Sequence, residues 1–437
     1  MSRKNSLQIA EWQRFGENEI FGVIESKEKA KKAFAELMDF AHGEKNAEFI
    51  GFVNSHTLKA KNFVGLIQTK SGFVLEILPK IFDREKDDKF KDKEEEKKSK
   101  DLLIKMLKTL KNSPFKHTQM ANLQVKKNFP LLEIFANMFL DELDIIIKSG
   151  IKNNYIAISQ NRHLLKGKLL FNEHLKQNLI HKERFFTNSD EFIADIPENR
   201  IIVSALNLLF GLNFGVKTKA RLTNAKFVFS DICESKNLST DFAKCQNSRH
   251  FSRYNLALLW CKIFLKNESF TQYSGSDKAF ALLFDMNLLF ESFVGHCFKK
   301  FSGKKWTIET QSFSKYLLYD ENKRDLFKMR PDILAIKGEN TIILDTKWKI
   351  IKNIKDDISQ GDLYQMFAYV KKFDSERNFL IYPKIGEKEN SYYTYKADNG
   401  KYKLQILFFK FFDKNGKFLD ENSMKEQIEK ILAVKND

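Results

Sequence analysis

The sequence predicts an α+β chain of several domains: a mostly β N-terminal domain, a helical middle region and a C-terminal α/β core with a mixed sheet. Three observations support this order: short alternating runs before residue 82, amphipathic helical patterns up to about Lys266, and a β-hairpin followed by a helix near the C-terminus. The resulting domains are residues 1–112, 113–266 and 267–437. A length of 437 residues agrees with two or three domains, since domains usually have roughly 100–200 residues.

The N-terminal domain is predicted to be rich in strands. Apolar and polar residues alternate in segments such as Glu48–Val53 and Gly72–Ile77, which is typical of half-buried strands. A dense run of charges follows at residues 83–101, with almost no apolar side chains. Such a segment cannot bury a core, so we expect a charged loop or a solvated helix there.

The middle region is predicted to consist of amphipathic helices. Apolar residues recur at helical spacing in Leu131–Ile147 and again in Asn199–Phe210. Pro197 and Glu198 favour a helix start just before the second of these segments. At the other end of the chain, we expect the C-terminal domain to finish with a strand at Tyr402–Phe412 and a polar helix.

The C-terminal domain contains the most informative local pattern, two β-rich runs on either side of a turn. The runs are Ile333–Ile336 and Thr341–Leu344, and the turn residues between them are Gly338–Asn340. This arrangement predicts a β-hairpin. Folding the hairpin brings Asp332 roughly opposite Asp345.

Two carboxylates and an ammonium group are expected to converge at this hairpin. Side chains alternate along a strand, so Asp345 and Lys347 share one face, while Thr346 points away. Mg²⁺ prefers oxygen ligands and is usually bound by one or two carboxylates plus substrate phosphate. We therefore predict a Mg²⁺ site at Asp332 and Asp345, where Mn²⁺ can substitute, and count Thr346 among the metal-binding candidates.

This residue set suits hydrolysis of a phosphodiester. A bound metal polarises the phosphate and lowers the pKa of the attacking water. Lys347 can help to hold or deprotonate that water and can offset the charge that develops on the phosphate. The simpler alternative is a hairpin that carries an incidental surface salt bridge.

The helices on either side of the hairpin provide further candidates. Asp285–Phe298 has helical periodicity, and Glu291 at the edge of its apolar face can either complete the metal shell or be an ordinary boundary glutamate. Asp362, Gln365 and Tyr369 share one face of a later amphipathic helix. From that face, the amide of Gln365 and the hydroxyl of Tyr369 can position a nucleotide or a metal-bound water.

The order of these residues resembles a known family. From Phe280 to Pro383 the chain resembles the PD-(D/E)XK nuclease superfamily in its Gln-x-x-x-Tyr variant. More narrowly, it resembles the McrC family, the nuclease subunits of McrBC modification-dependent restriction systems. The segments that carry the narrower resemblance follow the order of that family: Phe63–Ile67, Leu75–Ile81, Leu102–Leu107, Leu132–Phe135, Leu164–Leu169 and Asp195–Arg200. One departure is Lys168, which stands where an arginine is commoner.

The resemblance implies a division of labour between two proteins. In this family an oligomeric AAA+ GTPase, the McrB-like subunit, reads 5-methylcytosine and translocates DNA. The McrC-like subunit docks its N-terminal domain on that ring, stimulates GTP hydrolysis and cuts double-stranded DNA. The resemblance therefore implies that residues 1–112 bind the partner and that residues 267–437 form a nuclease domain. Its catalytic residues would be Asp332, Asp345, Lys347, Gln365 and Tyr369.

Composition agrees with these expectations. The formal charge of +17 suits a polyanion such as DNA, although abundant Lys and Phe beside scarce Pro and Gly can also reflect the nucleotide composition of the gene. The chain has no Gly-x-x-x-x-Gly-Lys-Ser/Thr motif, so an NTP-driven step must come from another subunit. We expect a cytoplasmic protein with reduced cysteines and no membrane partner, because there is no Cys-x-x-Cys pair and no run of about 18 apolar residues.

Three functions remain open at this point. The chain can be the catalytic endonuclease subunit of the complex, a non-cleaving activator or scaffold of a motor NTPase, or a stand-alone DNA repair nuclease. The paired carboxylates favour catalysis, because their mutual repulsion costs stability unless a cation is present. No recognisable base-reading module stands out, so we do not expect this subunit to recognise modified cytosine by itself.

Overall fold

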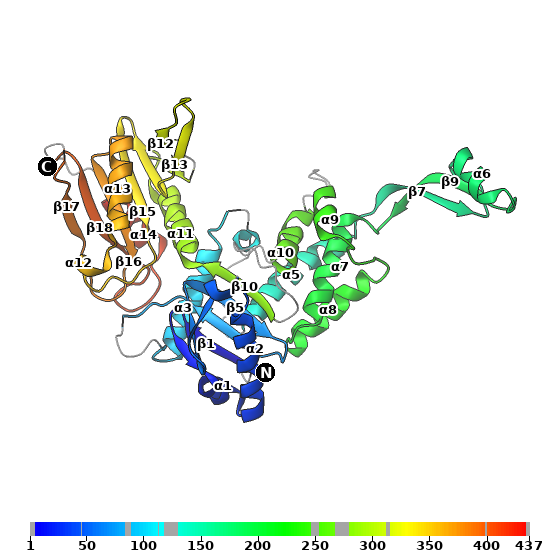
Figure 1. The fold of residues 1–437 in the computed structure, drawn as a ribbon, viewed down its shortest axis with the longest axis horizontal. Coiled ribbons are helices and arrows are strands. Elements are labelled where there is room, and N and C mark those ends of the chain that lie inside the picture. Colours follow the sequence, from blue (N-terminus) through cyan, green and yellow to red (C-terminus); the bar gives the residue numbers. More distant parts are fainter. Residues whose placement is uncertain are drawn as a thin grey trace. The chain divides into compact units, whose positions relative to one another are not determined.

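The computed structural model describes residues 5–44, 46–83, 89–111, 113–117, 130–245, 253–266, 279–311, 315–397 and 400–433. The chain forms two compact units, coloured along the sequence in Figure 1. One comprises Met120–Ser274 with Met1–Asn5, and the other combines Ser6–Gln119 with Gly275–Asp437. The second unit thus joins most of the predicted N-terminal domain to the predicted C-terminal core.

The first unit has a helical body with an aromatic core. Trp260 is stacked on Phe264 with ring centroids 5.6 Å apart, and Phe264 also packs edge-on against Phe139. The helices expected at Leu131–Ile147 and Asn199–Phe210 are confirmed, each to within two residues. No helix in the described part of the chain is long and apolar enough to cross a membrane. The body consists of α5 (Leu131–Lys148), α7 (Pro197–Phe210), α8 (Val216–Val228), α9 (Leu238–Lys244) and α10 (Asn255–Lys266).

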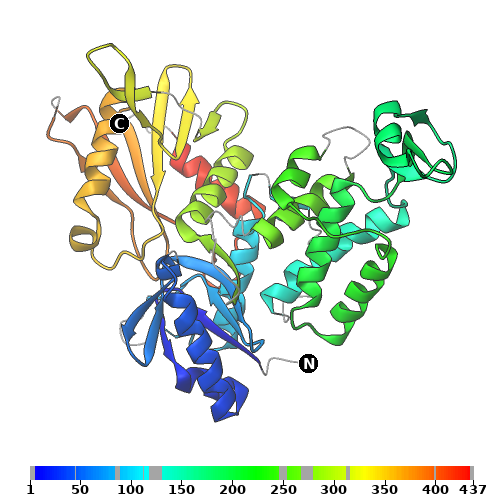
Figure 2. The ribbon, with the colours of Figure 1, turned by 45° about the vertical axis from the view of Figure 1, so that its right-hand side comes forward.

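A hairpin arm extends from this body, within the region 113–266 that was expected to be helical. Its long strands β7 (Asn154–Arg162) and β9 (Phe185–Ile193) pair antiparallel, and its tip carries β8 (Lys168–Leu169) and α6 (Phe171–Asn178) (Figure 2). Gly167 makes the tip possible: its φ is 76°, and a Cβ there would lie 2.3 Å from the Asn188 carbonyl oxygen.

The second unit contains a four-stranded sheet that unites distant parts of the chain. Its strand order is β1 (Ser6–Ala10), β6 (Val74–Leu78), β5 (Phe63–Thr69) and β10 (Ala279–Asp285). Gly65 in β5 has a φ of 137°, and a Cβ there would lie 2.0 Å from the carbonyl oxygen of Leu282 in β10. Glycine therefore permits the close approach of the N-terminal sheet to the strand that leads into the C-terminal core.

Helices accompany this sheet, so the N-terminal segment is less purely β than expected. The charged run at 83–101 is not a loop throughout, because α3 (Lys93–Leu107) begins within it. The Asp92 side chain accepts hydrogen bonds from the backbone amides of Glu94 and Glu95, which caps that helix. The remaining elements of this segment are β2 (Arg14–Gly16), α1 (Glu17–Ile24), α2 (Lys27–Ala41), η2 (Asn46–Glu48), β3 (Ile50–Asn54), β4 (Thr57–Ala60) and η3 (Pro114–His117).

The C-terminal core is built on a mixed six-stranded sheet. The predicted hairpin is present as β14 (Ile333–Lys337) and β15 (Asn340–Thr346), and β15 pairs in parallel with β16 (Arg377–Pro383). The sheet also contains β11 (Thr307–Thr310), β18 (Lys403–Phe409) and β17 (Ser391–Thr394), in the order β11-β14-β15-β16-β18-β17. A separate two-stranded hairpin, β12 (Lys315–Tyr319) and β13 (Asp325–Met329), immediately precedes β14.

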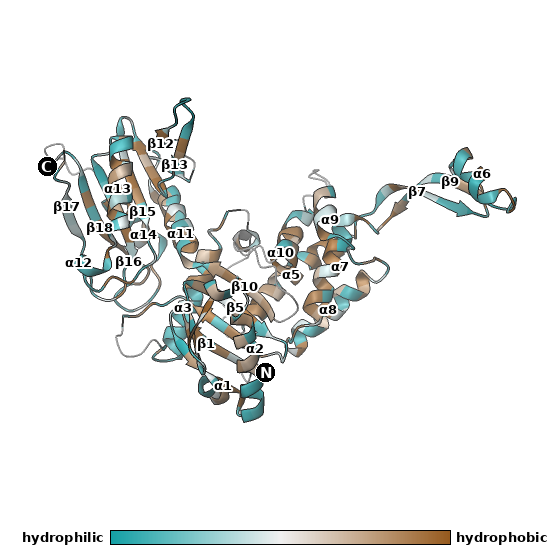
Figure 3. Cartoon of the chain, in the orientation of Figure 1, coloured by the Kyte–Doolittle hydropathy of each residue, from teal (hydrophilic) through white to brown (hydrophobic). Residues whose placement is uncertain are grey.

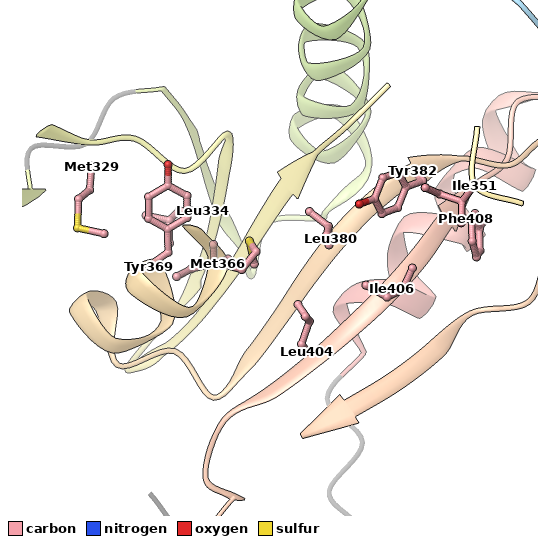
Figure 4. Close-up of a cluster of buried hydrophobic side chains, with 11 residues drawn as sticks. Met329, Leu334, Ile351, Met366, Tyr369, Leu380, Tyr382, Leu404, Ile406 and Phe408 are labelled. Atoms are coloured by element: carbon pink, nitrogen blue, oxygen red, sulfur yellow. The ribbon is translucent and has the colours of Figure 1, made fainter. Parts of the chain in front are cut away.

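Helices cover both faces of this sheet. On one face, α13 (Gln360–Phe373) buries Met366 and Tyr369 against Leu334, Leu380 and other apolar side chains (Figure 4). On the other face, Phe290 and Phe293 of α11 (Met286–Phe301) pack against Phe409. The core is completed by the short α12 (Ile354–Asp357) and the C-terminal α14 (Glu421–Leu432).

Candidate active site

The β14–β15 hairpin brings the two predicted carboxylates together. Ile333 pairs with Leu344, so Asp332 lies beside the end of β15. One carboxylate oxygen of Asp332, Oδ2, accepts hydrogen bonds from both the amide and the hydroxyl of Thr346, each 2.7 Å long. Thr346 was expected to point away from the carboxylates. Its hydroxyl instead holds Asp332 in place.

Lys347 lies against the second carboxylate. Its Nζ is 2.6 Å from Oδ2 of Asp345, whose side chain is almost completely buried, and 3.9 Å from Asp362. The same ammonium donates to the Gln365 side-chain oxygen at 3.3 Å. The ammonium is therefore held between β15 and α13.

Gln365 and Tyr369 continue this network. The amide nitrogen of Gln365 donates to the Tyr369 hydroxyl at 2.9 Å, and that hydroxyl donates to the backbone oxygen of Arg330 at 3.1 Å. Helical spacing places both side chains on the same face of α13, as the sequence predicts. The structure thus brings Asp332, Asp345, Lys347, Gln365 and Tyr369 into one network, and their roles remain predictions.

Glu291 lies on α11, close enough to interact electrostatically with the cluster. One of its carboxylate oxygens accepts a 2.7 Å hydrogen bond from the side chain of Gln311. Burial raises the pKa of Glu291, and the charge of Asp345 adds to the effect. In the described part of the chain, no three His, Cys, Asp or Glu side chains form a group that could by itself hold a metal ion. A third metal ligand at Glu291 therefore remains a prediction.

The electrostatics of the cluster suit a cation. Burial, together with the neighbouring charge of Asp332, raises the pKa of Asp345 to about 7. Burial also raises the pKa of Asp332 to about 6, with a contribution from Glu291. Burial alone would lower the pKa of Lys347, but the ion pair with Asp345 outweighs this effect and the pKa is raised.

Two desolvated carboxylates fit the usual protein contribution to a Mg²⁺ site, in which water and substrate phosphate supply the remaining oxygens. Asp332 and Asp345 are the residues that would hold the ion. A cation between them would offset the charge of Asp332, which contributes to the raised pKa of Asp345.

Sequence patterns did not predict that residues outside the C-terminal core support the end of β15. Trp348 follows Lys347 directly, and its indole nitrogen donates a 2.6 Å hydrogen bond to the fully buried carboxylate of Glu11. Glu11 also accepts the backbone amide of Lys80 at 2.9 Å. A separation of 337 residues along the chain leaves no local spacing by which this contact could be found.

Comparison with known protein families shows which family the chain belongs to. The family described as McrBC 5-methylcytosine restriction system component matches residues 58–383, about three quarters of the sequence. The chain belongs to this McrBC family. The match covers strands β6, β5 and β10 of the four-stranded sheet, the helical unit with its arm, and the core as far as Pro383, the last residue of β16.

Solved McrBC structures have the same fold. A refined half-complex from a tetradecameric assembly of Thermococcus gammatolerans McrB AAA+ hexamers with bound McrC aligns with a TM-score of 0.68 and 17% identity, covering 98% of this chain and 100% of the other. The cryo-EM structure of the Thermococcus gammatolerans McrBC complex aligns with a TM-score of 0.50 and 20% identity, covering 68% and 88%. No curated protein matches the chain.

Proposed function

We propose that this chain is the Mg²⁺-dependent DNA endonuclease subunit of a modification-dependent restriction complex that acts on DNA containing 5-methylcytosine, as in antiphage defence. The observation that carries the proposal is the convergence of Asp332, Asp345 and Lys347 in a member of the McrBC family. A scaffold would gain nothing from two buried carboxylates side by side, since burial without a cation disfavours both charged forms.

The residues would divide the hydrolysis of a phosphodiester among them. Asp332, fixed by Thr346, and Asp345 would bind the metal ion. When bound, Mg²⁺ would supply Lewis-acid activation of the phosphate and a lower pKa for the attacking water. Lys347, between Asp345 and Gln365, is placed to orient that water and to donate to the phosphate. Tyr369 would keep Gln365 in this position.

We further propose that an oligomeric McrB-like AAA+ GTPase supplies DNA recognition and translocation. Support comes from the Thermococcus gammatolerans structure, which contains McrB AAA+ hexamers with bound McrC, and from the lack of a P-loop motif in this chain. The family resemblance implies that the partner contact lies in residues 1–112. The runs Phe63–Ile67 and Leu75–Ile81 that motivated this placement are largely buried, because they form β5 and β6 of the four-stranded sheet.

The arm of the other unit offers a more exposed surface for such a partner. Its apolar side chains cannot be covered by the narrow hairpin that carries them, and Figure 3 shows hydrophobic and hydrophilic residues side by side along it. We propose that this surface also contacts the ring. The exposed apolar residues of the arm are Tyr155, Leu164, Leu165, Phe171, Leu175, Leu179, Ile180 and Phe192.

The proposal is tested by combining the protein with its candidate GTPase and measuring cleavage of methylated and unmethylated duplexes with GTP and Mg²⁺. We expect cleavage only of methylated DNA and only with both proteins present. Stimulation of the GTPase without any cleavage would identify a scaffold, and cleavage without the GTPase would identify a stand-alone nuclease. Replacing Leu175, Leu179 and Ile180 by serine should reduce GTPase stimulation, whereas serine at the exposed Val216 of α8 should not.

A further inference from the structure

The β12–β13 hairpin is an exposed projection next to the candidate active site. Figures 1 and 2 show it leaving the body of the six-stranded sheet. Both strands expose large apolar side chains, and Phe327 in β13 is 69% exposed. The others are Leu317, Leu318, Tyr319 and Leu326.

Phe327 is also conformationally strained. Its φ is 57°, in the left-handed region that is unfavourable for a bulky side chain. The strand ladder pairs Leu318 with Leu326 and Tyr316 with Lys328, but it does not pair Phe327. Glycine or asparagine would fit this backbone better, and an exposed ring gains little from packing. A strained, exposed aromatic residue of this kind indicates a functional contact rather than a contribution to the fold.

The same hairpin carries net positive charge, with five Lys and Arg against Asp320, Glu321 and Asp325 between residues 315 and 330. Four exposed cations, Lys323, Arg324, Lys328 and Arg330, lie on it or at its base, and none forms an ion pair with a residue that the structure describes. The carboxylate of Asp320 accepts the backbone amide of Arg324 and closes the turn. Unpaired cations around apolar side chains suit a polyanion, whereas a second copy of this chain, with a formal charge of +17, would be repelled.

The base of the hairpin is tied directly to the candidate catalytic network. Met329 is buried in the core under α13, and the backbone oxygen of Arg330 accepts the hydroxyl of Tyr369 at 3.1 Å. On the other strand, the ammonium of Lys315 donates to the backbone oxygen of Lys372 at 3.2 Å. Asp332 follows two residues after Arg330. A ligand bound by the hairpin is therefore held in a fixed position relative to the carboxylates of Asp332 and Asp345.

We propose that the β12–β13 hairpin binds duplex DNA, with its cations on the phosphates and Phe327 inserted as an apolar wedge in the minor groove, and so sets which phosphodiester reaches Asp332 and Asp345. Apolar wedges of this kind unstack a base step while neighbouring cations hold the backbone. The inference rests on the proposed function, because it takes DNA as the substrate of the site.

Binding can be tested separately from cleavage in the full-length chain carrying Asp345→Asn. Fluorescence anisotropy with a labelled duplex, at several salt concentrations and without the GTPase, gives both affinity and salt dependence. Phe327→Ala should weaken binding about tenfold, as expected for the loss of an aromatic contact with a base, and should leave the salt slope unchanged. Lys328→Ala should instead reduce the slope of log K against log salt by about 0.9.

Two further variants separate DNA binding from folding. Phe327→Gly should not lower the melting temperature, because glycine accepts the left-handed backbone, yet it should weaken binding as much as alanine does. Phe227→Ala removes another exposed phenylalanine, on α8, and should change neither the melting temperature nor the affinity for DNA. In a duplex containing 2-aminopurine, the protein should raise fluorescence by unstacking the base, and Phe327→Ala should abolish the rise.

Unchanged affinity in Phe327→Ala, Phe327→Gly and Lys328→Ala would overturn the inference, as would a lack of duplex binding at low salt. The inference would also be overturned if the protein self-associates and Phe327→Gly loses this self-association but retains DNA binding. In that case the hairpin would bind a second copy of the chain. These outcomes are independent of the proposed catalytic role, which is tested separately by DNA cleavage with the wild type and with Asp345→Asn.

Discussion

Changing Glu11 to glutamine should stabilise the protein at alkaline pH. The Glu11 carboxylate is completely buried, and one of its oxygens accepts hydrogen bonds from the indole nitrogen of Trp348 and from the backbone amide of Lys80. The other oxygen, Oε2, has no hydrogen-bond partner among the described residues. Glutamine has the same shape and retains an oxygen acceptor for both donors, but it carries no charge to desolvate.

The magnitude follows from the pKa of this residue. Burial raises the pKa of Glu11 from 4.5 to about 7, hydrogen bonds from Lys80 and Trp348 oppose the rise, and the charges of Lys80 and Asp285 act in opposite directions. An acid whose pKa is raised on folding destabilises the folded state once it ionises. The free energy of unfolding therefore falls by about 3 kcal/mol as the pH rises from about 4.5 to 7, because a shift of one pKa unit corresponds to about 1.4 kcal/mol.

Calorimetric melting of wild type and Glu11→Gln at pH 5 and pH 8 measures this difference. The advantage of the glutamine variant should be about 2 to 3 kcal/mol larger at pH 8 than at pH 5. Glu28→Gln, which changes an exposed glutamate on α2, is the matched control and should follow the wild type at both pH values. An advantage that does not change with pH would refute the argument that Glu11 carries a desolvated charge.

Other predictions concern the candidate site and DNA recognition. Tyr369→Phe and Gln365→Ala should each slow cleavage less than loss of Asp345, because they disturb only the hydrogen bonds that position Lys347. Single-turnover cleavage rates measure the effect of each variant. A loss of cleavage as complete as that of Asp345→Asn would contradict the prediction. Glu291→Ala should shift the Mg²⁺ titration to higher concentration, and an unchanged titration would make Glu291 structural. The isolated chain should bind methylated and unmethylated duplexes equally at fixed salt in a gel-shift competition; a clear methyl preference would place base recognition in this subunit.

Local patterns predicted how the candidate residues lie relative to one another, because they are close in sequence. The turn at Gly338–Asn340 and the alternation along β15 were sufficient to place Asp332 beside Asp345, and helical spacing put Gln365 and Tyr369 on one face of α13. The helix at Leu131–Lys148 was equally visible, because its apolar residues repeat at helical spacing over several turns.

Long-range pairings were not predictable in the same way. The arm strands β7 and β9 lie in a zone expected to be helical, where nothing local shows which segment each strand pairs with. The pairing of β10 with β5 and the contact of Glu11 with Trp348 depend on residues more than 200 positions apart. A fragment starting near residue 112 would therefore lose β5, the strand that pairs with β10, so arm variants are a cleaner test of partner binding.

The most direct test of the account is Mg²⁺-dependent DNA cleavage by the complex reconstituted with Asp345→Asn. Removing the charge of a buried carboxylate, while keeping its shape, should abolish cleavage and leave stimulation of the GTPase intact. The control is Asp231→Asn, which changes an exposed aspartate beyond α8 and should cut like the wild type. Undiminished cleavage by Asp345→Asn would contradict the assignment of the hairpin as a metal-dependent nuclease site.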